Sequence, residues 1–139
     1  GCAFDPFIQI MTNGGEFTAT NSDTVSHNIH TYEILGRAKK TVFNISQPNK
    51  GDVKKEIKLK RGTAMKVECD QHDFMHGFVF VAKNPYFALV ADDGSYTIEG
   101  VPPGKYTIKA WHGTLKEQKG KVEVAADGTV TSDFEFKAK

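Results

Sequence analysis

A short segment in the middle of the chain carries a cysteine, a histidine and a methionine at close spacing. These residues are Cys69, His72 and Met75, and they lie between two segments with the alternating pattern of β-strands. Thiolate and thioether sulfur are soft ligands that favour Cu(I), whereas imidazole nitrogen accepts both oxidation states of copper. Two histidines, one cysteine and a weak axial methionine form a recurrent site for fast electron transfer. The segment therefore predicts a site for one copper ion, Cu(I)/Cu(II), that still needs a second histidine.

The second histidine must come from elsewhere, and the upstream segment Ser26-His27-Asn28-Ile29-His30 offers two candidates. This segment follows the turn-forming residues 21–23 and is expected to begin a strand. Positions three apart on a strand point to opposite faces. We therefore do not expect His27 and His30 to be ligands of the same ion.

The composition limits the class of protein. With 139 residues, of which 39% are hydrophobic, the chain is long enough for one or two small domains with a packed core. Its 18 Lys and Arg balance 17 Asp and Glu, so no surface for nucleic acid is expected. No apolar stretch approaches the roughly 20 residues of a membrane span, and no signal peptide remains. We expect a soluble or processed form without a membrane span.

Short alternating segments indicate an all-β fold. Glycine and proline interrupt them as turns, for example at residues 13–15, 92–94 and 101–104. Regularly spaced short strands with such turns favour a β-sandwich. The least regular part, residues 31–49, is expected to be a long excursion between strands. The alternating apolar positions that predict strands are Val53, Ile57 and Leu59, Met65 and Val67, Tyr106 and Ile108, and Phe134 and Phe136.

A composition shift near Lys83-Asn84-Pro85 predicts two units. The first, residues 1–83, contains the Cys-His-Met segment and four of the five histidines. The second, residues 84–139, is a run of hairpins. The joint is short, so we expect two closely packed β units rather than domains on a flexible linker.

The first unit resembles a cupredoxin, the plastocyanin-like blue-copper fold, over residues 3–82. The resemblance lies in the turn before Ser26-His27-Asn28 and in the pattern Val67-x-Cys69-x-x-His72-x-x-Met75-x-Gly77. It implies a Greek-key β-sandwich in which His27, Cys69, His72 and Met75 bind copper. The two residues between His72 and Met75 are fewer than in plastocyanin, and a shorter loop changes how the axial sulfur approaches the metal.

The second unit resembles the carboxypeptidase regulatory-like, transthyretin-like β-sandwich module. The resemblance rests on an Asp-Gly hairpin, an alternating strand, a Pro-Pro-Gly turn and a second alternating strand, within residues 91–108. Such modules are structural or adhesive, which implies no catalytic residues. The combination resembles bacterial secreted proteins that join the two units and carry a pair such as Trp111-His112. This implies a periplasmic or extracellular one-electron carrier whose partners are redox proteins such as cytochromes.

The remaining histidines and acidic residues near the site have several interpretations. His30 is a hydrogen-bond donor behind the ligands, a surface port for electrons or a structural strand histidine, and an additional ligand role is open for His30 and His112. His112 has a structural role as its other interpretation. His76 is expected to be exposed and to point away from the metal, and Asp70 and Asp73 are expected to be solvated turn residues.

Alternative functions follow from the same residues. Four protein ligands leave no exchangeable coordination position, so we do not expect an enzyme. A non-catalytic copper-binding protein, a carrier or a structural or adhesive assembly protein is the alternative.

The strands after Pro85 are expected to have unpaired edges. We therefore expect that the first unit caps them or that the protein self-associates through its β-edges. Cys2 is left open as a partner in an external disulfide, a thiol in the first strand or a lipoprotein remnant, the last disfavoured by Gly1.

Overall fold

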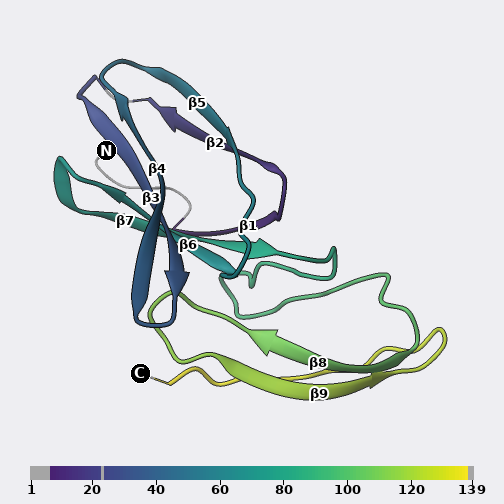
Figure 1. The fold of residues 1–139 in the computed structure, drawn as a ribbon. Helices are drawn as coiled ribbons and strands as arrows, with labels where there is room; N and C mark the ends of the chain where they lie inside the picture. The colour runs from purple at the N-terminus through teal and green to yellow at the C-terminus, as the bar shows by residue number, and fades with distance from the viewer. Residues whose placement is uncertain (1–6, 23, 138–139) are drawn as a thin grey trace. The chain divides into compact units, whose positions relative to one another are not determined.

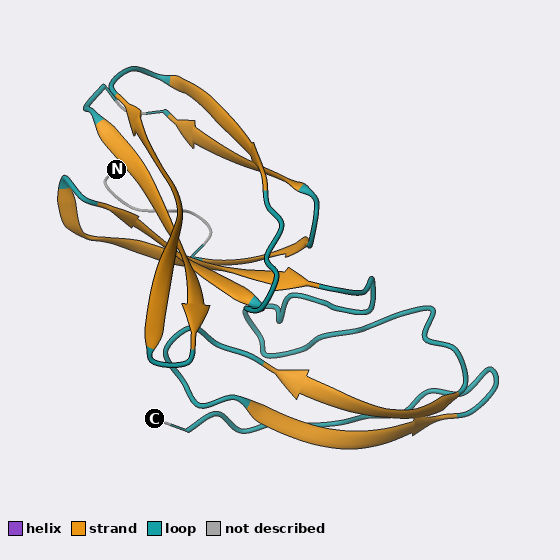
Figure 2. Ribbon diagram, viewed as in Figure 1, coloured by secondary structure: helices purple, strands orange, loops and turns teal. Residues whose placement is uncertain are grey.

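The computed structural model describes residues 7–22 and 24–137, with the backbone alone for residues 72–74. Cys2 lies outside the described residues. Every regular element in the described part of the chain is a β-strand (Figure 2). No helix in that part is long and apolar enough to cross a membrane. The predicted all-β class is confirmed.

The described residues form nine strands, most of them short. In chain order these are β1 Ile8–Thr12, β2 Glu16–Asn21, β3 His27–Leu35, β4 Ala38–Gln47, β5 Gly51–Glu56, β6 Ala64–Cys69, β7 His72–Ala82, β8 Gly104–Ala110 and β9 Gln118–Val124.

The largest sheet has five strands in the order β1-β7-β6-β3-β4 (Figure 1). β1 runs parallel to β7, and the other pairs are antiparallel. β3 and β4 form a long hairpin that turns at Gly36, whose φ of 64° suits glycine. The expected long excursion over residues 31–49 is therefore wrong. The register shifts between Thr31 and Tyr32, and this irregularity breaks the alternation that would identify a strand.

A two-stranded sheet, β2 paired with β5, packs on one face of the five-stranded sheet. The residues between the two sheets are apolar, as strand alternation requires. Ala19 of β2 shares this core with residues of β3, β6 and β7, and Phe17 packs against Phe43 with ring centroids 6.1 Å apart. The first unit is thus a β-sandwich. Its core comprises Ala19, Ile29, Ile57, Leu59, Met65, Val67, Val79 and Val81.

The chain divides into two compact units, residues 1–89 and 90–139. Within the described part of the second unit, β8 and β9 pair as an antiparallel sheet. The turn predicted at residues 92–94 is present, since Gly94 N–H donates to Ala91 O at 2.9 Å. The division into a copper-binding domain at 1–83 and a module at 84–139 stays a prediction.

The strand predicted around Phe134 and Phe136 does not form. The two phenylalanines are half-buried while the residues beside them are exposed. A Cβ placed on Gly120 of β9 would contact the Ser132 and Phe134 side chains at 3.4 and 3.5 Å. The segment therefore packs side chains onto β9 at this point, and its alternation reflects that contact rather than a hydrogen-bonded ladder.

Candidate metal centre

Cys69 is the last residue of β6 and points into the first unit. Alternation along β6 buries Met65, Val67 and Cys69, and Cys69 is 2% exposed. The register with β7 shifts between Glu68 and Cys69, where Cys69 lies opposite His72. Such irregularities re-aim side chains at functional sites. The local backbone thus turns the cysteine toward the start of β3.

His27 opens β3 and is buried, with 4% of its surface exposed. It lies opposite Gln47 in the β3–β4 register. Two buried amides fix the strand ends here, because Gln47 Nε2 donates to Ala19 O at 3.1 Å and Asn21 Nδ2 donates to Gln47 O at 3.1 Å. His27 therefore sits on a backbone that is tied to the second sheet.

The structure brings the thiol of Cys69 and the ring of His27 together. The Cys69 Sγ atom lies 3.9 Å from His27 Nδ1, and the backbone N–H of Asn28 donates to the same sulfur at 3.4 Å. Metal–nitrogen bonds of about 2.0 Å and metal–sulfur bonds of about 2.3 Å, as in zinc sites, separate the two donors by about 3.5 to 3.9 Å at bond angles of about 110 to 130°. The spacing fits two donors to one transition-metal ion.

The other two predicted ligands lie on β7. Met75 is buried, with 4% of its surface exposed. The side chain of His72 lies outside the described residues. The described side chains contain no group of three or more His, Cys, Asp or Glu that could hold a metal ion. The ligand set His27, Cys69, His72 and Met75 thus stays a prediction. Of these four residues, the structure brings His27 and Cys69 close together.

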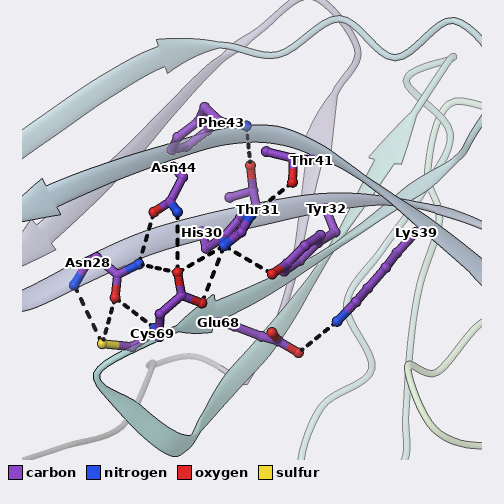
Figure 3. A network of polar contacts seen from close by, with 11 residues as sticks. Asn28, His30, Thr31, Tyr32, Lys39, Thr41, Phe43, Asn44, Glu68 and Cys69 are labelled. Atoms are coloured by element: carbon purple, nitrogen blue, oxygen red, sulfur yellow. Dashed lines mark hydrogen bonds and ion pairs between the residues drawn. The ribbon is translucent and has the colours of Figure 1, made fainter.

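His30 lies apart from the sulfur, in a polar network with Tyr32 and Thr41 (Figure 3). Its Nδ1 atom is 3.0 Å from Asp70 Oδ2, and its Nε2 atom is 2.9 Å from Thr41 Oγ1. The ring stacks on Tyr32 with centroids 4.0 Å apart. Because both ring nitrogens have protein partners, His30 acts here as a hydrogen-bonding strand histidine. Its additional metal role stays a prediction.

Asp70 is an exposed turn residue, as expected, and its carboxylate is in addition the hub of this network. Although its side chain is 47% exposed, its carboxylate accepts hydrogen bonds from His30, from Asn28 Nδ2 at 2.9 Å and from Asn44 Nδ2 at 3.2 Å. The hydrogen bond from His30, followed by those from Asn28 and Asn44, lowers the pKa of Asp70 despite partial burial. The residue is held as a carboxylate beside Cys69. Asp73 lies outside the residues whose side chains are described.

Sequence reasoning missed Asn28, Tyr32 and Asn44 as parts of this site. Strand periodicity was the available signal, since Asn28, His30 and Tyr32 are two residues apart and share one face. Tyr32 also faces negative charge: burial, then Glu68 and Asp70, raise its pKa. Burial opposes ionisation of Glu68, but the hydrogen bond and charge of Lys66 outweigh it and lower its pKa.

His76 and His112 each pack against an aromatic ring. His76 is exposed, as expected, and packs edge-on against Phe7 with centroids 5.5 Å apart, although it lies in β7 rather than in a loop. His112 belongs to the second unit, where it lies 5.9 Å from the Phe136 ring and its Nδ1 accepts from Thr114 N–H. A role of His112 at the metal stays a prediction.

Comparison with protein families gives a match over residues 60–132, more than half of the chain, to the fibronectin-3-like model described as polysaccharide lyase family 4, domain II. The chain belongs to this family. The match to polysaccharide lyase family 4, domain II, includes Cys69 and Met75 and begins after His27. The family is named for a domain of a lyase, which does not say whether this chain is an enzyme. No curated protein and no solved structure gives a significant match.

Proposed function

We propose that the chain is a mononuclear copper protein for one-electron transfer. The observation that carries the proposal is the buried pair His27 Nδ1 and Cys69 Sγ at 3.9 Å, with the Asn28 N–H aimed at the sulfur. His27, Cys69, His72 and Met75 would hold the ion, which when bound supplies a one-electron couple between Cu(I) and Cu(II). This donor set matches the cupredoxin resemblance of the first unit.

The protein's own contribution is to keep these donors in place and away from water. Cys69, His27 and Met75 are each at most 4% exposed, so these three candidate donors are shielded from water. The N–H of Asn28 withdraws electron density from the sulfur, and hydrogen bonding around the cysteine sulfur tunes the reduction potential of such sites. Four protein donors leave no exchangeable position, which is why we propose a carrier of electrons rather than an enzyme.

We further propose a setting for this activity. The second unit is, in this proposal, a carboxypeptidase regulatory-like module without chemistry of its own. The combination with a cupredoxin unit places the protein in the bacterial periplasm or outside the cell, where its partners are redox proteins such as cytochromes. We propose neither a membrane span nor a nucleic-acid partner for this protein.

The test is a copper titration of the chain followed by visible absorption, electron paramagnetic resonance and redox titration. We expect one copper per chain, a sulfur-to-copper charge-transfer band and reversible one-electron cycling. Cys69→Ser should abolish the band and the cycling while the fold stays intact. The matched control is Cys2→Ser, which removes the other cysteine of the sequence and should leave both unchanged.

Two outcomes would count against the proposal. An unchanged spectrum in Cys69→Ser would remove the thiolate from the site. Copper that binds at one equivalent but never cycles would favour the alternative, a non-catalytic copper carrier or a structural protein.

A further inference from the structure

The side-chain amide of Asn28 has every hydrogen-bonding position engaged. Its Nδ2 donates to Asp70 Oδ2 and to Asn44 Oδ1, both at 2.9 Å. Its Oδ1 accepts from Asp70 N–H at 2.7 Å and faces Cys69 Sγ at 3.3 Å. An amide has two donor hydrogens and one acceptor oxygen, so a rotation of Asn28 would break bonds on both sides. The orientation of this amide is therefore linked to the position of the Cys69 sulfur.

The Asp70 carboxylate is one of the groups that hold this orientation. Asp70 contacts Asn28 twice, through its carboxylate and through its backbone N–H, and so closes a ring of hydrogen bonds between the start of β3 and the end of β6. The carboxylate is braced in turn by His30, whose ring is held by Thr41 and stacked on Tyr32. Hydrogen bonds to an ionised acceptor are stronger than those between neutral groups.

We propose that Asp70 is a positioning residue: its carboxylate, braced by His30, fixes the Asn28 amide and thereby holds the Cys69 sulfur in its binding position before any metal arrives. The inference rests on the proposed function in taking Cys69 as a metal ligand. Residues behind a ligand orient it and set its affinity, commonly by 10- to 100-fold. Asp70 touches the ligand loop rather than the metal.

Glu68 provides a matched control. It carries the same charge and is the other sequence neighbour of Cys69, but it pairs with Lys66 at 2.9 Å and with Lys39 at 3.5 Å rather than with Asn28. Glu68→Gln therefore removes a nearby negative charge and leaves the Asn28 ring of hydrogen bonds in place. Asp70→Ala removes the charge and both acceptor oxygens, whereas Asp70→Asn removes the charge and replaces one acceptor oxygen with an NH2 donor.

The first test uses the metal-free protein. Hydrogen exchange of the Asn28 backbone amide, which donates to the Cys69 sulfur, is measured by NMR. Asp70→Ala should speed this exchange about tenfold, as loss of a charge-assisted hydrogen bond implies, whereas Glu68→Gln should change it less than about twofold. Amides of β7 paired with β1 report whether the fold is intact. If Asp70→Ala fails to fold, Asp70→Asn decides, with the same direction expected.

The second test uses copper and measures the ratio of Cu(II) to Cu(I) affinity. Asp70→Ala should lower the ratio about tenfold, equivalent to a 59 mV rise in potential for one electron, and Glu68→Gln should lower it less. Equal effects of the two variants on exchange and on the ratio would overturn the inference. A wild-type chain that binds no copper would instead overturn the proposed function, and the metal-free exchange would still decide whether Asp70 positions Cys69.

Discussion

His27 and His30 are three residues apart on β3 and lie in different surroundings. His27 is buried beside the Cys69 sulfur, whereas the His30 ring bonds to Asp70 and Thr41 on a polar face. The opposite directions follow from the two-residue period of a strand. The two histidines therefore provide an internal comparison between a donor near the sulfur and a residue that supports the ligand loop.

Replacement of the two histidines should separate these roles. His27→Ala removes a donor, so Cu(II) affinity should fall more than about 100-fold, beyond the range for residues behind the ligands. His30→Ala should lower it by about 10-fold, because it removes one brace of Asp70. Competition titrations with a chelator of known affinity measure both. A larger loss in His30→Ala would show that the proposed ligand lies on the face of β3 that carries His30, and not on the face that carries His27.

The candidate donors could be chosen from the sequence more readily than the residues around them. Cys69 and His27 could be proposed as copper ligands because few residue types bind copper, and their types and spacing restrict the choice. Asn28 and Asp70 were not, since amides and carboxylates occur at many exposed turns and their role depends on which strands are neighbours. That information lies in the register of β3 against β6, where His30 faces Glu68.

At the scale of the element, Gly62 lies in the segment before β6 and packs closely against β3. It is buried, and its N–H donates to Glu33 Oε2 at 2.6 Å. A Cβ at this position would lie 2.8 Å from Glu33 Cγ and 2.9 Å from the backbone oxygen of Ile34. The Glu33 side chain can move, but the carbonyl belongs to the hairpin. Glycine is therefore required here by close approach rather than by an unusual φ.

Gly62→Ala should destabilise the protein by about 1–3 kcal/mol, the usual range for overpacking. Gly120→Ala is the control, because a Cβ there meets its neighbours at 3.4 Å or more, an ordinary contact distance. Its effect should stay within about 1 kcal/mol. Urea unfolding followed by circular dichroism measures both, and equal midpoints for the two variants would contradict the packing argument.

The sequence predicted those strands that have one buried face. β6 and β8 alternate regularly between covered and less covered positions, so periodicity located them. The β3–β4 hairpin was missed because a register shift interrupts its pattern, and because Arg37 in the turn and Lys39 and Lys40 at the start of β4 form a charged run that resembles a loop. The segment around Phe134 shows the opposite error, an alternating pattern without a ladder.

At the scale of the whole molecule, the second unit has few paired strands. Its sheet consists of β8 and β9 within the described residues, and a two-stranded sheet alone is marginally stable in water. Its outer edges invite pairing with another strand. Exposed apolar residues such as Leu89 and Val90, 55% and 57% exposed, stand where the two units divide.

We therefore expect the edges of the second unit to be covered, either by the chain itself or by a second copy. Light scattering gives the oligomeric state, and hydrogen exchange is followed in residues 87–91 and 129–136. Slow exchange in a monomer indicates coverage within the chain, and slow exchange that appears on association indicates a dimer. A strict monomer with fast exchange in both segments would contradict the expectation.

The parallel pairing of β1 with β7 has a consequence for synthesis on the ribosome. Ile8 pairs with Phe78, so the first strand emerges about 70 residues before its partner. At about 5–20 residues per second, β1 waits roughly 4 to 14 s as an unpaired strand. During that interval its backbone is exposed to other nascent chains and to chaperones. Slowing or speeding translation between β1 and β7 should therefore change how much of the protein reaches its native state.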